Sequence, residues 1–235
     1  MSSLILNPSM QDAIFNGGSC QLYWNQEKIW PTGSPEPPDP TIVVIGGRRY
    51  PVADMPDGRK WMTENLDFKA NGIHIGTGGS TYGSNARYYN DDESTYGVDG
   101  NKYGLLYNWY AVNYLNNNRS TLFPGWHVPT IDEWDALKTA CGGTYSAGIK
   151  LKSTTDWSNG NGDGSTGFNA FPAGYGYFSS GTMYFWDSLY ETRFWTATNY
   201  SSSQSYGYKI DSDEVISTIS RKEQYYCSLR LIKDT

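Results

Sequence analysis

Five of the ten residues from Pro31 to Pro40 are proline. Proline has no backbone N–H and a fixed φ angle, so this segment cannot continue a helix or occupy the inside of a sheet. Proline-rich segments of this kind are typical of stiff, extended linkers. The sequence therefore predicts an N-terminal attachment module in residues 1–30, a linker in residues 31–40 and a main domain in residues 41–235.

The N-terminal module is too short to form a core of its own. Two short apolar runs flank Asn25 and Gln26 and predict a small, β-like hairpin. A segment of roughly thirty residues buries too little apolar surface to fold alone. We therefore expect this module to dock on a sister chain or on a larger assembly.

The composition of the chain is typical of a recognition surface. Charged residues make up only 18% of the sequence, whereas it contains 20 Tyr and 9 Trp. Tyr and Trp in excess of what a core needs are typical of proteins that bind ligands, glycans or other proteins. The net charge of −6 argues against a nucleic-acid partner, because such binding requires clustered Lys and Arg.

Neither a membrane anchor nor a disulfide framework is predicted. No run of about eighteen apolar residues occurs, so we expect no membrane insertion. The first residues lack the basic start, apolar run and cleavage site of a signal peptide. The three cysteines, Cys20, Cys141 and Cys227, are too widely spaced for a metal site or a disulfide scaffold, and we expect small buried thiols and assembly in a reducing cytosol.

The secondary-structure signals favour an α+β fold with few helices. Residues 41–47 are β-branched and end in two glycines, which predicts a strand, and residues 59–66 predict a second one. Residues 71–101 are rich in Gly, Ser, Asn and Tyr, and we expect them to form a long loop held on the surface.

Two helices are predicted. Thr130 and Glu133 form a capping box, in which the Thr130 hydroxyl accepts the backbone N–H of Glu133 and the Glu133 carboxylate reaches back. Apolar residues follow at helical spacing until Gly142 and Gly143, which predict the end of this helix. A shorter helix is expected to begin near Asn108.

No catalytic, metal or cofactor site is predicted. The only histidines are His74 and His127, and no motif of a known nucleophile or zinc site accompanies them. Residues 159–164 match the first half of a calcium loop, but its twelfth position is Ala170 instead of a carboxylate. We therefore expect a Gly-rich turn there.

The segment between residues 199 and 226 has the composition of an antibody paratope. It is rich in Ser and Tyr, begins with Asn199, contains several charged residues, and lies between two strand-like segments, residues 193–198 and 228–232. In paratopes Tyr supplies contact area for little entropy, and Ser and Asn supply adaptable hydrogen bonds. The candidate ligand contacts are Asn199, Tyr200, Ser202, Gln204, Tyr206, Tyr208, Asp213, Ser217, Arg221, Glu223 and Tyr225.

Alternation predicts which side chains of this region share a face. Tyr206, Tyr208 and Ile210 are expected on one face of a strand. In the last strand we expect one buried face that carries Cys227, Leu229 and Leu231. A solvated polar hairpin without a partner is the alternative to a binding face.

Seven blocks of the sequence occur in a familiar order. They are residues 58–66 (GRKWMTENL), 103–113 (YGLLYNWYAVN), 124–134 (PGWHVPTIDEW), 150–153, 167–174, 194–198 and 228–231. Over roughly residues 41–233 the chain thereby resembles the Fibrobacter succinogenes major paralogous domain, a family of Bacteroidetes and their phages. The resemblance implies a C-type-lectin fold, in which two helices flank a small twisted antiparallel sheet with long loops.

The resemblance also implies a use for the C-terminal face. Proteins of this fold serve as variable proteins of diversity-generating retroelements, in which adenine-directed mutagenesis converts Asn codons into codons for Asn, Ser, Tyr, Asp, Gly or His. Residues 199–226 are similar to that set, although His is missing from them. Trp195 and residues 229–232 would then be the fixed frame around a replaceable face.

The expected function is non-enzymatic binding by a phage tail adhesin. Residues 22–31 resemble short modules at the start of phage tail proteins, so residues 1–40 would attach the protein to a virion tail assembled in the host cytoplasm. Its partner would be a bacterial surface protein or glycan, and a homo-oligomer, for instance a trimer, would raise avidity.

Two other functions stay open. The first is a bacterial cell-surface adhesin or lectin of the same fold, which the missing signal peptide disfavours. The second is an enzyme of the formylglycine-generating type, which resembles this chain in fold and helix start. That chemistry requires two reactive cysteines close together, whereas Cys141 is predicted in a helix and Cys227 in the last strand.

Overall fold

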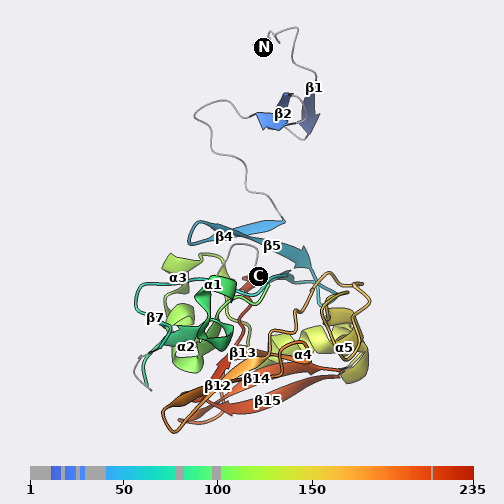
Figure 1. Cartoon of the computed structure of the whole chain (residues 1–235). Helices are drawn as coiled ribbons and strands as arrows, with labels where there is room; N and C mark the ends of the chain where they lie inside the picture. Colours follow the sequence, from blue (N-terminus) through green and yellow to red (C-terminus); the bar gives the residue numbers. More distant parts are fainter. Residues whose placement is uncertain are drawn as a thin grey trace. The chain divides into compact units, whose positions relative to one another are not determined.

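The computed structural model describes residues 12–16, 19–24, 27–29, 41–77, 82–96, 102–212 and 214–235. It divides the chain into two compact units, Met1–Asp39 and Pro40–Thr235 (Figure 1). In the first unit, β1 (Asp12–Asn16), β2 (Ser19–Trp24) and β3 (Glu27–Ile29) form an antiparallel sheet. The predicted hairpin is found as β2 and β3, with Trp24 opposite Glu27.

The second unit has an α+β fold with three sheets in its described residues. The first sheet has the order β10-β17-β6-β5-β4, made of β4 (Ile42–Ile45), β5 (Arg48–Asp54), β6 (Lys60–Met62), β10 (Trp126–His127) and β17 (Ile232–Lys233). The second has the order β12-β11-β16-β9-β8-β7, made of β7 (His74–Ile75), β8 (Asn85–Arg87), β9 (Leu106–Asn108), β11 (Tyr175–Ser179), β12 (Thr182–Trp186) and β16 (Tyr225–Cys227). The third is the meander of β13 (Glu191–Asn199), β14 (Gln204–Asp211) and β15 (Glu214–Arg221).

The helices of this unit are short. They are the 3₁₀ helix η1 (Tyr89–Asp91) and the α-helices α1 (Glu93–Tyr96), α2 (Trp109–Asn117), α3 (Arg119–Leu122), α4 (Ile131–Ala140) and α5 (Thr144–Leu151). Among the described residues, none of the helices has the length and apolar character that a membrane crossing requires.

Both predicted helix starts are confirmed. Thr130 and Glu133 make the capping box at the start of α4, and the Asn108 side chain accepts the backbone N–H of Ala111 at the start of α2. The expected number of two helices is too small, because α5 follows α4 directly after Gly142 and Gly143. Helix α5 buries mainly small side chains, so its apolar face is a weak signal in the sequence.

The prediction of a surface loop over residues 71–101 is wrong in its middle. Strand β8 lies in this segment, and all three of its residues are buried. Asn85 and Arg87 have partners in this position: Asn85 Nδ2 donates to Gly83 O at 2.8 Å, the Asn85 backbone N–H donates to Asn108 Oδ1 at 3.0 Å, and Arg87 pairs with Asp91 at 2.9 Å. Because Asn85 and Arg87 are polar, the sequence does not show that this strand lies in the core.

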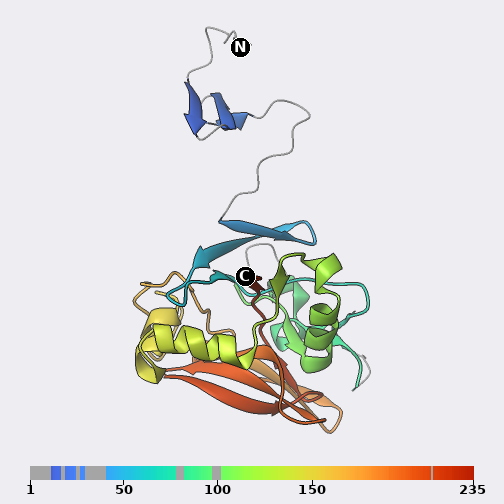
Figure 2. The same cartoon turned by 180° about the vertical axis from the view of Figure 1, so that it is seen from behind.

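An aromatic cluster joins α4 to the third sheet. Trp134 on α4 stacks on Tyr208 of β14, with ring centroids 5.1 Å apart and planes inclined by 16°. The Trp134 ring also contacts the rings of Trp61 and Phe194, with centroid distances of 5.1 Å and 5.3 Å. Figure 2 shows α4 and α5 lying along these strands. The cluster fixes one face of the third sheet against the helices.

The C-terminal segment from β16 to β17 is buried on both sides. Leu229 and Leu231 are buried as predicted, but Tyr226, Arg230 and Ile232 are buried as well. The reason is its position: β16 pairs with β9 and β11, whereas β17 pairs with β6 and β10. The segment thus passes through the middle of the unit (Figures 1 and 2), and residues 226–232 are all buried.

A histidine network holds the end of this segment. His127 on β10 lies between two carboxylates, with Nδ1 2.6 Å from Asp234 and Nε2 3.0 Å from Glu133. Glu133 also pairs with Arg59. Burial alone would lower the pKa of His127, but its hydrogen bonds with Glu133 and Asp234 outweigh burial and raise that pKa above 6.5. Protonated His127 therefore stabilises the folded state.

We expect this stabilisation to depend on pH. It should be fully present below pH 6.5, the ordinary pKa of histidine, and should be lost as the pH rises through the higher pKa of the folded state. The free energy of unfolding in urea should therefore fall more between pH 6 and 9 for the wild type than for His127→Gln. Equal pH dependence of the two proteins would contradict this role of His127.

Candidate functional site

One end of the third sheet carries most of the predicted contact residues. Asn199, Tyr200, Ser202 and Arg221 are exposed there, and Gln204 and Tyr206 are half-buried. Together with the neighbouring Ile219, which is 45% exposed, these residues are called the hairpin-end surface.

Strand pairing brings these side chains together. Gln204 lies opposite Arg221 on β15, and Tyr206 lies opposite Ile219 on the same face. The rings of Tyr200 and Tyr206 meet edge to face, with centroids 5.4 Å apart. The surface therefore offers aromatic area beside amide, hydroxyl and guanidinium groups.

A buried lysine holds the two turns of this surface. Its backbone N–H donates to Ser203 O at 3.0 Å, and its Nζ donates to Ser201 O at 2.9 Å and Ser202 O at 3.2 Å. This residue, Lys222, is 5% exposed, and its Nζ lies 4.3 Å above the ring of Trp109. Burial lowers the pKa of Lys222. The turns are exposed, but their backbone is tied to the core.

The structure moves one predicted contact into the core. Tyr208 shares a face of β14 with Tyr206 but is fully buried under α4, where its hydroxyl donates to Asp135. Burial, and then the hydrogen bond to Asp135, raise the pKa of Tyr208. The sequence misses this because α4 covers only part of the strand, and alternation does not reveal where the helix ends.

The other predicted contacts lie in different surroundings. Ser217 is exposed on β15, opposite Tyr208, and Asp213 lies outside the described residues. Glu223 faces Tyr110, whose pKa is raised by burial and then by the charge of Glu223. The ring of Tyr110 in turn contacts Tyr82, which is 74% exposed.

Tyr225 belongs to an aromatic face that the sequence predictions did not include. Tyr177 lies opposite Tyr225 and Tyr184, and Tyr175 lies opposite Trp186. These five rings therefore share one face of β12, β11 and β16. The Arg193 guanidinium lies 3.6 Å from the ring centre of Tyr175. The alternating aromatics of residues 175–177 and 184–186 are a sequence signal for this face.

The two cysteines of the second unit lie in separate core clusters. Cys141 packs with Trp134 and Leu137, whereas Cys227 packs with Trp195 and Leu229. Burial raises the pKa of both thiols, that of Cys227 to about 12. Both are therefore uncharged at neutral pH.

The Gly-rich segment of residues 159–164 is built as a turn. Asn161 Oδ1 accepts the backbone N–H of Trp157 at 3.0 Å, and Asp163 Oδ1 accepts that of Ser165 at 2.8 Å. These oxygens are thus used in local hydrogen bonds. Within the described parts of the chain, no group of three or more His, Cys, Asp or Glu side chains is placed to hold a metal ion.

Comparison with known proteins gives one match. The Fibrobacter succinogenes major domain matches residues 57–233, which contain the hairpin-end surface and both cysteines. No curated protein and no solved structure matches the chain.

We expect the hydrogen bonds of Lys222 to keep the turns of the hairpin-end surface in one conformation. Lys222→Met keeps an aliphatic stem over Trp109 but removes the charged donor, so it should lower the free energy of unfolding by about 1–3 kcal/mol. Exchange of the backbone amides of residues 201–204 should become faster. Lys233→Met, at an exposed position, is the control. Unchanged exchange in Lys222→Met would contradict the assignment.

Proposed function

Because this chain belongs to the Fibrobacter succinogenes major domain family, we propose that it is a ligand-binding protein that presents the hairpin-end surface to its partner. The proposal rests on the contrast between the exposed side chains of the hairpin-end surface and the buried residues next to them. Exposed Tyr, Asn, Ser and Arg side chains lie at the ends of β13, β14 and β15 and in the turn before β14, whereas neighbouring strand residues such as Phe194 and Ser205 are buried.

Each exposed side chain has a use in binding. Tyr200 and Tyr206 supply contact area for little loss of rotamer entropy. Asn199, Ser202 and Gln204 supply hydrogen bonds. Arg221, whose side chain is exposed beside them, supplies charge selectivity.

We further propose a C-type-lectin fold and a variable face. The exposed positions hold Asn, Ser and Tyr, which are among the residues that adenine-directed mutagenesis of Asn codons creates. The buried neighbours would be the constant frame. A nearby reverse transcriptase gene, with a repeat that differs only at adenines, would support this. Absence of both would contradict diversification by a retroelement.

The place of action is proposed as a phage tail. Residues 1–40 would attach a homo-oligomer, for instance a trimer, to the tail, and the partner would be a bacterial surface protein or glycan. A bacterial cell-surface adhesin is the alternative, and tail genes beside this gene would favour the phage. Binding without catalysis is supported by the separation of Cys141 and Cys227 in two core clusters.

The binding proposal is tested by removing the exposed anchors. The combined variant Tyr200→Ala, Tyr206→Ala and Arg221→Ala should lose binding to intact bacterial cells at least tenfold, because aromatic and Arg anchors each contribute about 1–2 kcal/mol or more. Cell binding of the fluorescent protein is measured by flow cytometry over a panel of strains.

The control replaces an exposed tyrosine elsewhere. Tyr145 on α5 is 67% exposed and lies near Glu214, at the opposite end of β15 from Arg221. Tyr145→Ala should bind like the wild type. Undiminished cell binding by a folded triple variant would refute the hairpin-end surface as the binding site.

A further inference from the structure

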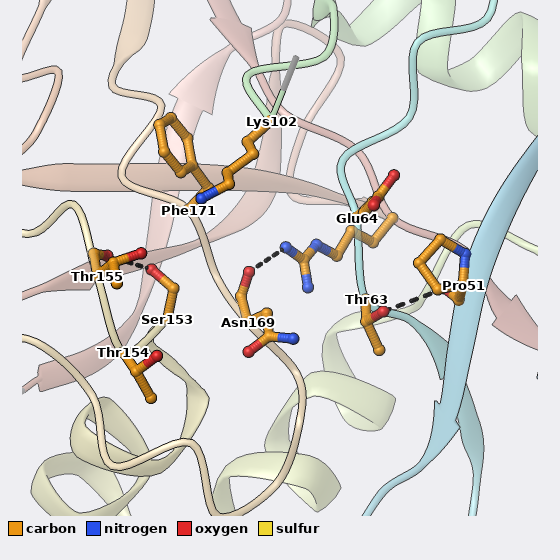
Figure 3. A pocket seen from close by; sticks show the side chains of 10 residues that line it. Pro51, Thr63, Glu64, Lys102, Ser153, Thr154, Thr155, Asn169 and Phe171 are labelled. Carbon is orange, nitrogen blue, oxygen red and sulfur yellow. Dashed lines mark hydrogen bonds between the residues drawn. The ribbon is translucent and has the colours of Figure 1, made fainter. Parts of the chain in front are cut away.

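A second concave site lies outside the hairpin-end surface. It is a cavity of about 370 Å³ lined by Pro51, Thr63, Glu64, Lys102, Ser153, Thr154, Thr155, Asn169, Phe171 and Arg230. Figure 3 shows these side chains converging from separate segments of the chain. The volume lies in the range of pockets that hold small molecules.

The only fully buried charge of this cavity belongs to Arg230, which is 1% exposed. Its Nε donates to Asn65 Oδ1 at 3.0 Å, its Nη2 to Asn169 O at 2.8 Å and its Nη1 to Phe168 O. All of these acceptors are uncharged amide oxygens. They orient the guanidinium without neutralising it.

The other charges of the cavity have neighbours of opposite charge. Lys102 pairs with Asp156 at 3.0 Å. Glu64 lies 3.6 Å from Arg48, which also pairs with Asp67 at 3.0 Å, and the charge of Glu64 also acts on Arg230. No carboxylate forms an ion pair with Arg230 among the described residues. The three charged side chains that line the cavity, Glu64, Lys102 and Arg230, sum to one positive charge.

A buried charge without an ion pair is energetically unfavourable, because it has lost its hydration and gains little in return. Desolvation lowers the pKa of Arg230 to about 9, although the charge of Glu64 acts in the opposite direction. At neutral pH the guanidinium remains protonated. A bound monoanion would give this guanidinium an ion-pair partner.

The rest of the lining is suited to a hydroxyl-rich ligand. Thr63, Ser153, Thr154 and Thr155 contribute hydroxyl groups, and the exposed side chain of Asn169 contributes an amide. Phe171 forms an apolar wall, over which Lys102 Nζ lies 5.8 Å from the ring centre. Hydroxyls and an amide on one side and a ring on the other match a sugar, which has polar edges and an apolar face.

We propose that this cavity binds an acidic monosaccharide, whose carboxylate is attracted by Arg230 and whose hydroxyl groups bond to the Ser, Thr and Asn side chains. The site shares no residue with the hairpin-end surface. If the cavity does not bind an acidic sugar, the proposed function of the hairpin-end surface is unaffected. If the hairpin-end surface does not bind a partner, the proposal for the cavity is unaffected.

The full chain is titrated with galacturonate at pH 7 and followed by ¹H–¹⁵N NMR. We expect saturable shifts at residues 153–155 and 169, with a dissociation constant of roughly 1 mM or tighter. Galactose, which has the same ring without the carboxylate, should bind at least tenfold more weakly. Absence of shifts with galacturonate, or equal binding of galactose, would overturn the proposal.

Titrations with inorganic phosphate and with acetate test whether a negative charge alone is sufficient for binding. Both should bind at least tenfold more weakly than galacturonate, because neither engages the hydroxyl-rich wall. If either binds as tightly as galacturonate, the sugar part of the proposal is wrong.

Two variants test the lining residues. Arg230→Met should abolish galacturonate binding, but it also removes hydrogen bonds of the core, so Asn169→Gly is the variant that preserves the fold. Asn169 has φ = 53°, which glycine adopts freely, and its carbonyl to Arg230 is retained. The loss of its amide should weaken binding roughly tenfold.

Asn90→Gly is the matched control, because Asn90 is also an exposed Asn with φ = 57° and does not line the cavity. It should bind galacturonate like the wild type. Equal affinity of Asn169→Gly and Asn90→Gly would overturn the assignment of Asn169.

Discussion

The segment from β16 to β17 connects all three sheets of the second unit. Through β16 it pairs with β9 and β11, through a bridge between Ser228 and Phe194 it reaches the third sheet, and through β17 it pairs with β6 and β10. Arg230 adds hydrogen bonds to Asn65 and to the carbonyls of Phe168 and Asn169. Every sheet of the described unit therefore depends on one short, buried stretch of chain.

This arrangement separates support from recognition. The third sheet is held at one end by Trp134, stacked on Tyr208, and at the other by Lys222, which binds the backbone of the exposed turns. Because carbonyls and not side chains accept the bonds of Lys222, residues such as Ser202 can be replaced without removing the tie. This arrangement of bonds would allow the proposed replacement of side chains on this surface.

The sequence predicts features that depend on local chemistry. The capping box of Thr130, the cap at Asn108 and the β-branched strand before Gly46 are found, and the resemblance to the Fibrobacter succinogenes major domain is confirmed over residues 57–233. Features that depend on distant contacts are missed. Tyr208 is buried by a helix far away in sequence, and β8 is buried because its polar residues find partners. Neither contact can be predicted from the residues that neighbour it in the sequence.

We propose that the side chains of the hairpin-end surface can change while the fold does not. The direct measurement compares two libraries, each substituted with Asn, Ser, Tyr and Asp. One varies Asn199, Tyr200, Ser202, Gln204, Tyr206 and Arg221, and the other varies the buried residues Thr196, Ser205, Tyr208 and Ser220. Free energies of unfolding in the first should stay within about 1 kcal/mol of the wild type, whereas those in the second should fall by several kcal/mol. Equal losses of stability in the two libraries would contradict the account.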